Sequence, residues 1–215
     1  MTSYILEATS ISPISKNKPQ QVIVLCHGYG GDGKDISMLS YNWKRYLSNT
    51  IIICPDAQEK CSISPSGFQW FDLSSDDPKK ILIESKKAEN KIKEYINEIN
   101  SYFKLKNSQV CISGFSQGCM MSINVGLTSE ESFNCIVGFS GKIIDKEDIS
   151  KRIKSKTKML LIHGDEDVVV PPSSLLEAKD FLIRHKVNFE TKMIKNCGHH
   201  IPIEASCIER NYIKK

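Results

Sequence analysis

The stretch that decides the fold is residues 109–127, which read QVCISGFSQGCMMSINVGL. It begins with a short apolar run typical of a buried strand and ends in a run typical of a helix. Between the two lies Gly114-Phe115-Ser116-Gln117-Gly118, a G-x-S-x-G motif in the strand–turn–helix context of a nucleophile elbow. The glycines permit a very sharp turn, so we expect Ser116 at its exposed tip, facing the N–H groups that begin the helix.

Length and composition are those of an ordinary globular protein, and we expect one domain over residues 1–215. The 29 basic and 25 acidic residues give a formal net charge of +4. The lysines are scattered, and their densest group, residues 142–158, alternates with acids in a way typical of a solvated surface. No basic block is interleaved with aromatic residues, so no nucleic-acid partner is predicted.

The chain has eight cysteines. Four of them lie in or at the ends of apolar runs, where a thiol packs as a small hydrophobe: Cys26, Cys54, Cys111 and Cys135. There is no C-x-x-C pair, so neither a disulfide framework nor a zinc ribbon is predicted. Residues 1–20 lack the apolar core of a signal peptide, and no run of 18 apolar residues occurs. We therefore expect a cytoplasmic protein with no stable membrane insertion.

Short apolar runs alternate with helical stretches along the chain. The predicted strands are residues 21–26, 50–54, 109–113, 135–139, 158–162 and 189–194. Most are apolar almost throughout, as strands buried on both faces of a parallel sheet are. The predicted helices are residues 78–103, the stretch after Ser116, residues 172–185 and residues 203–212. This alternation predicts an α/β fold, with a mostly parallel central sheet and helices on both faces.

A serine hydroxyl needs a base to become nucleophilic at neutral pH, and the base needs an acid that orients it. In hydrolases with a nucleophile elbow, the acid follows the serine in the chain and the histidine comes last. The base candidates are His199 and His200, behind the last predicted strand. Gly198 permits a turn that brings His199 back toward Ser116. Adjacent histidines point in different directions, so one is expected to be the base, and a zinc site formed by the pair is disfavoured.

The acid candidates lie in His163-Gly164-Asp165-Glu166-Asp167, directly after the predicted strand 158–162. Asp165 stands where a side chain can cap the turn, and Glu166 can be solvated. Position alone gives Asp167 even odds against the other two together. The alternative is an acidic turn without chemistry.

The oxyanion that forms during acyl transfer needs two aimed hydrogen-bond donors. One is expected from the backbone N–H of Gln117, directly after the nucleophile. The other is expected from the glycine-rich loop His27-Gly28-Tyr29-Gly30-Gly31-Asp32-Gly33, which follows the first long strand. The spacing of these glycines fits neither phosphate-binding motif, so a nucleotide is disfavoured. The position of His27 at the strand end favours an orienting hydrogen bond.

Together these motifs resemble the phospholipase/carboxylesterase family of small α/β-hydrolases, which includes the acyl-protein thioesterases. The matching segments are residues 25–33 (LCHGYGGDG), 69–72 (QWFD), 114–118 (GFSQG), 163–171 (HGDEDVVVP) and 198–199 (GH). They occur in the family's order and cover about residues 21–212. One departure is Cys119, where the family commonly has Gly or Ala, so helix–strand packing is expected to differ there.

The resemblance implies an α/β-hydrolase fold and hydrolysis of acyl esters or thioesters, without metal or cofactor. It implies Ser116 as nucleophile, His199 as base, and oxyanion donors from the backbones of Tyr29 and Gln117. It favours Asp167 as the acid, because the family's acid stands four residues before the proline of this loop. Several family members form homodimers, so a homodimer is a possible assembly.

An apolar groove for the acyl chain is also expected. The aromatic segment Gly67-Phe68-Gln69-Trp70-Phe71 is equally typical of core packing and of a pocket wall. With Trp70, the side chains of Met38, Leu39 and Met120 are the candidates for this substrate-binding groove. Amide or peptide hydrolysis requires the same three catalytic groups, and a binding module on a hydrolase fold is the alternative from another class.

Overall fold

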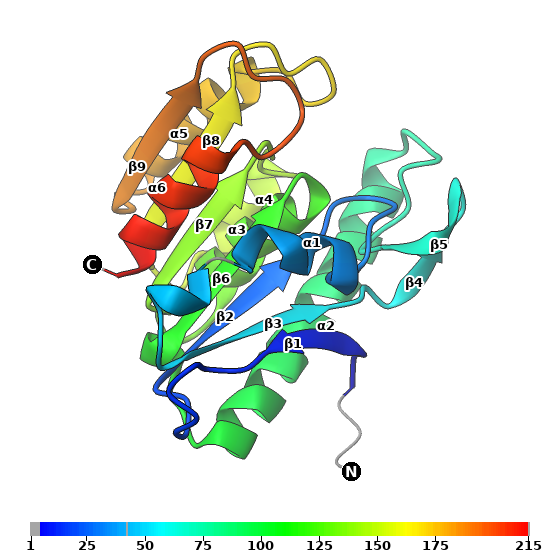
Figure 1. Ribbon diagram of the computed structural model, residues 1–215. Coiled ribbons are helices and arrows are strands. Elements are labelled where there is room, and N and C mark those ends of the chain that lie inside the picture. Colours follow the sequence, from blue (N-terminus) through cyan, green and yellow to red (C-terminus); the bar gives the residue numbers. More distant parts are fainter. Residues whose placement is uncertain (1–4, 42, 215) are drawn as a thin grey trace.

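The computed structural model describes residues 5–41 and 43–214, which form a seven-stranded sheet with helices on both of its faces (Figure 1). Across the sheet the strands are β1 (Ala8–Ile11), β3 (Thr50–Pro55), β2 (Gln21–Cys26), β6 (Val110–Phe115), β7 (Cys135–Phe139), β8 (Met159–Gly164) and β9 (Phe189–Ile194). Among the described pairings of this seven-stranded sheet, β1 with β3 is antiparallel and the others are parallel. The predicted α/β architecture is therefore confirmed.

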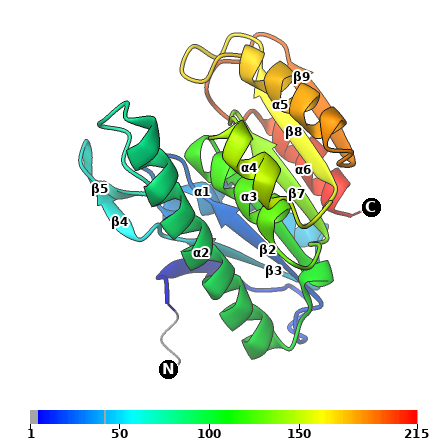
Figure 2. The same ribbon diagram turned by 180° about the vertical axis from the view of Figure 1, so that it is seen from behind.

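One set of helices covers the face of the sheet that is turned to the viewer in Figure 1, and another set covers the opposite face, seen in Figure 2. The first set is α1 (Gly33–Ser40) and α6 (Ile203–Ile213). The second set is α2 (Pro78–Phe103), α3 (Gln117–Thr128), α4 (Lys146–Arg152) and α5 (Ser173–Arg184). Short 3₁₀ turns span Trp43–Arg45 and Asn107–Gln109, and a hairpin of β4 (Glu59–Cys61) and β5 (Ser64–Gln69) stands beside the sheet.

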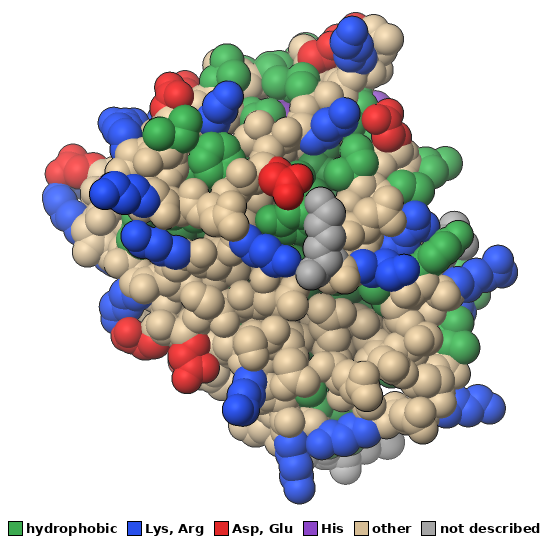
Figure 3. Space-filling model, turned by 90° about the vertical axis from the view of Figure 1, so that its left-hand side faces the viewer, with side chains coloured by type: hydrophobic (Ala, Val, Ile, Leu, Met, Phe, Trp, Pro, Cys, Tyr) green, Lys and Arg blue, Asp and Glu red, His purple; other side chains and the backbone are tan. Residues whose placement is uncertain are grey.

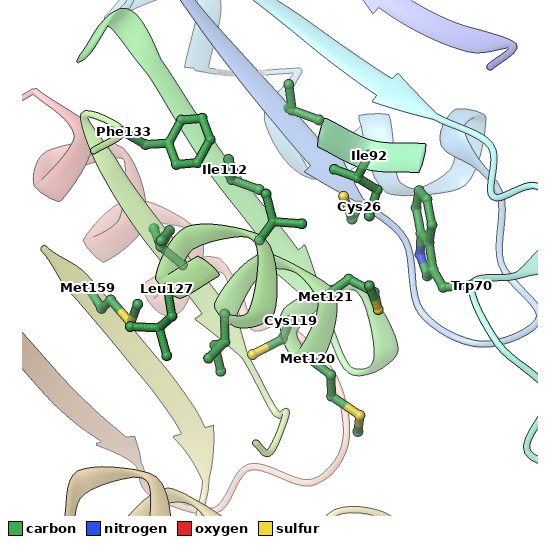
Figure 4. Close-up of a cluster of buried hydrophobic side chains, with 14 of the residues drawn as sticks. Cys26, Trp70, Ile92, Ile112, Cys119, Met120, Met121, Leu127, Phe133 and Met159 are labelled. Carbon is green, nitrogen blue, oxygen red and sulfur yellow. The ribbon is translucent and has the colours of Figure 1, made fainter. Parts of the chain in front are cut away.

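Each central strand contributes side chains to two cores, as strands buried on both faces must. In β2, Val22 and Val24 pack under α2 and α3, whereas Ile23 and Leu25 pack on the α1 and α6 side. Figure 4 shows the first core, where the α3 side chains Met121 and Leu127 are packed among neighbours from β6 and β8. Helix α3 is buried along its whole length, which explains why it is apolar on every side.

The edge elements were not predicted from the sequence. Strand β1 alternates between exposed and half-buried residues, and β5 contains Pro65 and Gly67, so neither has the apolar pattern of the central strands. Helix α1 lies partly within the glycine-rich stretch and is capped by Asp32, whose carboxylate accepts the N–H of Asp35. The structure of these short elements depends more on contacts with neighbouring segments than on their own sequence pattern.

The lysines of residues 142–158 are mostly exposed, as expected of a solvated surface, but the segment also has a buried side. Ile149 of α4 is buried, and Arg152 donates two hydrogen bonds to the buried carboxylate of Glu89 on α2. Lys93 donates to the same carboxylate at 2.8 Å. Glu89 is buried while its cationic partners, Arg152 and Lys93, remain half exposed. Elsewhere lysines are dispersed, as on the face in Figure 3, where basic and acidic side chains are interspersed.

The parallel strands β2, β6, β8 and β9 all end at the same edge of the sheet. Their carboxyl ends lead into the glycine-rich loop after Cys26, the turn at Ser116, the acidic loop after Gly164 and the histidine loop after Ile194. In open α/β sheets, loops at this edge form the ligand site. No helix among residues 5–41 and 43–214 is long and apolar enough to cross a membrane.

Candidate active site

Ser116 stands at the sharp turn between β6 and α3, with φ 51° and ψ −112°. A non-glycine residue in this conformation is strained, and strained residues are concentrated at functional sites. The turn is possible because two glycines lack side chains: a Cβ at Gly114 would lie 2.3 Å from the Gly118 carbonyl, and one at Gly118 would lie 2.2 Å from the Cys26 carbonyl oxygen. The Ser116 N–H donates to the Phe139 carbonyl at 2.8 Å, which anchors the turn to β7.

The residue after the elbow, Cys119, also finds its space through glycines. A Cβ at Gly138 or at Gly141 would come within 2.4 Å of the Cys119 Sγ. The Cys119 thiol thus occupies the space that is left by Gly138 on β7 and by Gly141 just after that strand.

The structure brings three of the candidate side chains into one hydrogen-bonded chain. The Ser116 Oγ lies 3.0 Å from Nε2 of His199, and the Nδ1 of His199 lies 2.8 Å from Oδ2 of Asp167. A carboxylate can only accept, so Nδ1 carries the proton and Nε2 is left to accept the Ser116 hydroxyl. His199 is therefore in the tautomer that a general base needs.

The other candidates in these two loops point elsewhere. The Oδ1 of Asp165 lies 3.4 Å from the Cys197 amide, consistent with a role in shaping the loop, and Glu166 is exposed. His200 is exposed, with its Nε2 3.9 Å from the Cys197 Sγ. The backbone bends at these residues, where the His200 N–H donates to the Gly198 carbonyl at 2.9 Å, and the loop directs His199 toward Ser116 while His200 stays at the surface.

Asp167 is buried, and its second oxygen, Oδ1, accepts the backbone N–H groups of Val169 at 3.0 Å and Val170 at 2.9 Å. Burial alone would raise the pKa of the Asp167 carboxyl. The hydrogen bond from His199 and those from Val170 and Val169 outweigh burial and place this pKa below its ordinary value. The carboxylate is therefore ionised at neutral pH.

A second histidine borders this acid and was not identified as functional from the sequence. His163, at the end of β8, is buried, and its Nε2 lies 2.8 Å from the Val170 carbonyl and 3.4 Å from Oδ2 of Asp167. Both neighbours are acceptors, so Nε2 carries the proton. The available signal was its position in the matched segment 163–171, directly before the acidic loop.

The two backbone N–H groups expected to bind an oxyanion belong to different segments near Ser116. Gln117 is the first residue of α3, and Tyr29 lies in the glycine-rich loop, where it lines the same cleft as Ser116. None of the described residues accepts a hydrogen bond from either N–H. Both donors are thus available to a ligand.

A cleft of about 670 Å³ opens over Ser116 and His199. Its walls are mostly apolar and come from the segment after β5, the start of α2, α3, the loop between β7 and α4, and the acidic loop: Phe71, Leu73, Pro78, Ile81, Met120, Ile144, Val169, Val170 and Pro171. Lys142, Asp76 and Asp145 add charges to its lining. A concave, largely apolar site with a few polar groups at one place is typical of a small-molecule pocket.

Of the four residues expected to line this groove, only Met120 does so. Trp70 is 1% exposed, and its indole N–H donates to the His27 carbonyl at 3.0 Å, so it belongs to the core. Its neighbour Phe71 faces the cleft instead. Met38 is 70% exposed on α1, and Leu39 packs against the core on that side of the sheet. The expectation failed for these three because local sequence cannot show which side of a segment faces the cleft.

The thiols show no arrangement for chemistry at this site. All eight cysteines are free, and seven are buried. Burial raises the pKa of the Cys26 and Cys119 thiols to about 12, so both stay protonated. Within the described ranges, no group of three His, Cys, Asp or Glu side chains is placed to bind a metal ion.

This fold and this site define an α/β-hydrolase. Among solved structures, the chain is similar to esterase PE8, with a TM-score of 0.92 and 29% identity over 97% of this chain and 98% of that one. Among characterised proteins, it is 27% identical to acyl-protein thioesterase 1 of Saccharomyces cerevisiae, over 91% of this chain and 92% of the relative. It is 24% identical to acyl-protein thioesterase 1 homolog 1 of Dictyostelium discoideum, over 90% and 89%.

The sequence pattern of the phospholipase/carboxylesterase family matches residues 9–215. The chain belongs to this family, and it is a carboxylic ester hydrolase.

Proposed function

We propose that the protein hydrolyses acyl esters or acyl thioesters through a covalent acyl-enzyme formed on Ser116. The observation that carries the proposal is the Ser116–His199–Asp167 chain of hydrogen bonds at the floor of an apolar cleft. The relatives named acyl-protein thioesterase favour an acyl thioester or a related acyl ester, such as a lysophospholipid, as the substrate class.

In this mechanism Nε2 of His199 takes the proton of the Ser116 hydroxyl as Oγ attacks the acyl carbonyl carbon. The positive imidazolium that results is stabilised by the ionised Asp167, 2.8 Å from Nδ1. The tetrahedral oxyanion accepts hydrogen bonds from the N–H groups of Gln117 and Tyr29. His199 then protonates the leaving alcohol or thiol, and a water molecule, activated by the same base, releases the fatty acid.

The cleft supports a substrate with an apolar acyl chain. Phe71, Ile81 and Met120 line it beside Ser116, and each buried methylene of a chain contributes about 0.8 kcal/mol to binding. We propose that the chain lies along this wall. The free thiols, seven of them buried, also favour a reducing compartment such as the cytoplasm.

The proposal is tested with a fluorophosphonate probe and with p-nitrophenyl esters and acyl thioesters of increasing chain length. Wild-type protein should be labelled at Ser116 and should turn over medium acyl chains faster than acetyl. The variant Ser116→Ala should lose both labelling and turnover. A matched control is Ser101→Ala, which removes an exposed hydroxyl of α2 bonded only to the Asn97 carbonyl and should behave as wild type. Labelling that persists in Ser116→Ala would refute the assignment.

A further inference from the structure

The side chain of Gln117 is buried and hydrogen-bonded at both ends of its amide. Its Oε1 accepts the backbone N–H of Trp70 at 2.8 Å, and its Nε2 donates to the Phe71 carbonyl at 2.7 Å. Only an amide of this length both accepts and donates in this way. The residue whose backbone N–H is one proposed oxyanion donor is thus tied by its own side chain to residues 70 and 71.

The same segment contacts His27, which follows β2 and begins the loop that contains the other donor. The indole N–H of Trp70 donates to the His27 carbonyl at 3.0 Å, and the two rings stack with centroids 5.3 Å apart. His27 in turn lies 2.7 Å, through Nδ1, from the Gly28 carbonyl, and its Nε2 accepts the Ala57 N–H at 3.0 Å. Burial lowers the pKa of His27, so the ring is neutral, as this pair of bonds requires.

Beyond Tyr29, the loop is held by the end of β5. Gly30 donates its N–H to the Phe68 carbonyl at 2.9 Å, and the Phe68 N–H donates to Gly31 at 2.8 Å. The approach is so close that a Cβ at Gly67 would lie 2.0 Å from the Gly30 carbonyl oxygen. Residues 68–71 are therefore bonded on one side to the loop that contains Tyr29 and on the other to the Gln117 side chain.

This arrangement matters because an oxyanion must lie about 2.7–3.1 Å from both donors at once. The two N–H groups belong to a helix and to a loop that follow different strands, β6 and β2. A small shift between helix and loop would misplace one donor, and losing one donor typically lowers kcat roughly a hundredfold to a thousandfold.

We propose that the Gln117 side chain is a positioning residue that fixes the Tyr29 and Gln117 N–H groups relative to each other through residues 68–71. This inference rests on the proposed function, because it concerns the oxyanion of that reaction. The ground-state carbonyl makes little use of these donors, so the side chain is expected to affect kcat and leave KM nearly unchanged.

The test compares steady-state kinetics of wild type, Gln117→Met and Gln117→Glu on the preferred p-nitrophenyl ester. The methionine is close to the glutamine in shape but makes neither bond, and kcat should fall on the order of ten- to a hundredfold, with KM within about twofold. A trifluoromethyl ketone with the same acyl chain, which forms an oxyanion on Ser116, should bind less tightly by the same factor as kcat. The matched control is Gln109→Met, because the Gln109 amide also accepts one backbone N–H (Lys106, 3.1 Å) and donates to one carbonyl (Gln20, 2.8 Å) but lies at the opposite end of β6 from Ser116, and its kcat should equal that of wild type.

The Gln117→Glu variant adds a readout that a purely structural role would not move. The carboxyl group that this substitution introduces can donate to the Phe71 carbonyl when it is protonated, but not when it is ionised. The kcat of Gln117→Glu relative to wild type should therefore rise as the pH falls.

Trp70→Phe keeps a ring against His27 but removes the indole donor, so it carries the test if the Gln117 variants fail to fold. Its kcat should fall with KM unchanged. If wild type hydrolyses the ester and Gln117→Met or Trp70→Phe keeps its kcat within twofold, or changes only KM, this inference is wrong while the proposed function stands. An inactive, unlabelled wild type would overturn the proposed function itself.

Discussion

Replacing Asp167 with asparagine tests the proposed mechanism at a carboxylate whose two oxygens both have defined hydrogen-bond partners. The Oδ1 of Asp167 accepts two backbone N–H groups, at 3.0 and 2.9 Å, and Oδ2 faces His199. In Asp167→Asn the amide oxygen must keep the Oδ1 position. The reverse orientation would bury an NH₂ against two N–H donors, and each unsatisfied buried group costs roughly 1–3 kcal/mol.

The amide NH₂ then faces Nδ1 of His199 at the former 2.8 Å contact. Because an NH₂ group only donates, Nδ1 must become an acceptor and the ring proton moves to Nε2. In that tautomer Nε2 points a proton at Ser116 and cannot take one from it. An inverted tautomer of this kind lowers kcat about 10⁴-fold, or about 5.4 kcal/mol of activation free energy.

The assay is the initial rate on a p-nitrophenyl ester, with thermal unfolding measured in parallel. Asp167→Asn should remain folded and keep its KM while kcat collapses. Asp165→Asn and Glu166→Gln are matched controls, because neither side chain contacts His199, and both should stay within about threefold of wild type in kcat. If Asp167→Asn retained a tenth or more of the wild-type kcat, or if either control lost activity instead, the assignment of the acid would be refuted.

Three further outcomes follow from the same contacts. Met120→Trp should shorten the preferred acyl chain in a p-nitrophenyl ester panel: excluding two methylenes costs about 1.6 kcal/mol, roughly fifteenfold in kcat/KM for the longest chain, whereas Met38→Trp should leave the profile unchanged. Burial raises the pKa of the Glu209 carboxyl well above its ordinary value of 4.5, so the stability that its protonated form contributes is full below pH 4.5 and is lost as the pH rises through the folded-state pKa. Glu209→Gln should therefore unfold at a higher temperature than wild type at pH 8, and the difference should vanish toward pH 4. Unfolding temperatures that differ by the same amount at every pH would contradict this. Glu89→Ala leaves Arg152 with Asp148 as its remaining carboxylate partner and removes the acceptor of Lys93, so it should lower the free energy of unfolding in urea by about 1–3 kcal/mol; a loss below 1 kcal/mol would show that the buried carboxylate contributes little.

Where sequence prediction succeeded, the pattern was strong and local. The central strands are continuous apolar runs, and helix α2 begins at Pro78, where Asp77 accepts the Lys79 N–H, as the sequence indicated. Boundaries moved by one or two residues, since strand ends depend on pairing: β8 runs on to Gly164 because Ile194 pairs with it. The hairpin of β4 and β5 has no such pattern, and its shape depends on the backbone bonds of Phe68 to the glycine-rich loop.

The candidate site divides in the same way. The elbow could be recognised from the sequence because the residues that define it, 114–118, are consecutive. Position in the sequence left the choice among three acids, and between His199 and His200, open, because it depends on which side chain of a loop turns inward. The family resemblance pointed to Asp167 and His199, and the coordinates bring these two side chains together. Trp70 and Phe71 make the point most directly: two adjacent aromatic residues are alike as sequence and both are buried, yet of the two Phe71 lines the cleft and Trp70 does not.

The residues alone specify the order of the chemistry along the chain: a nucleophile turn that only glycines permit at 114 and 118, followed by an acidic loop and a histidine loop, each behind an apolar strand. Which side chains meet depends on the folded arrangement, because parallel pairing places the ends of β6, β8 and β9 at one edge of the sheet. The buried contacts of Gln117 and His163 also became visible only there, since hydrogen bonds between residues distant in the chain leave no periodic trace in the sequence.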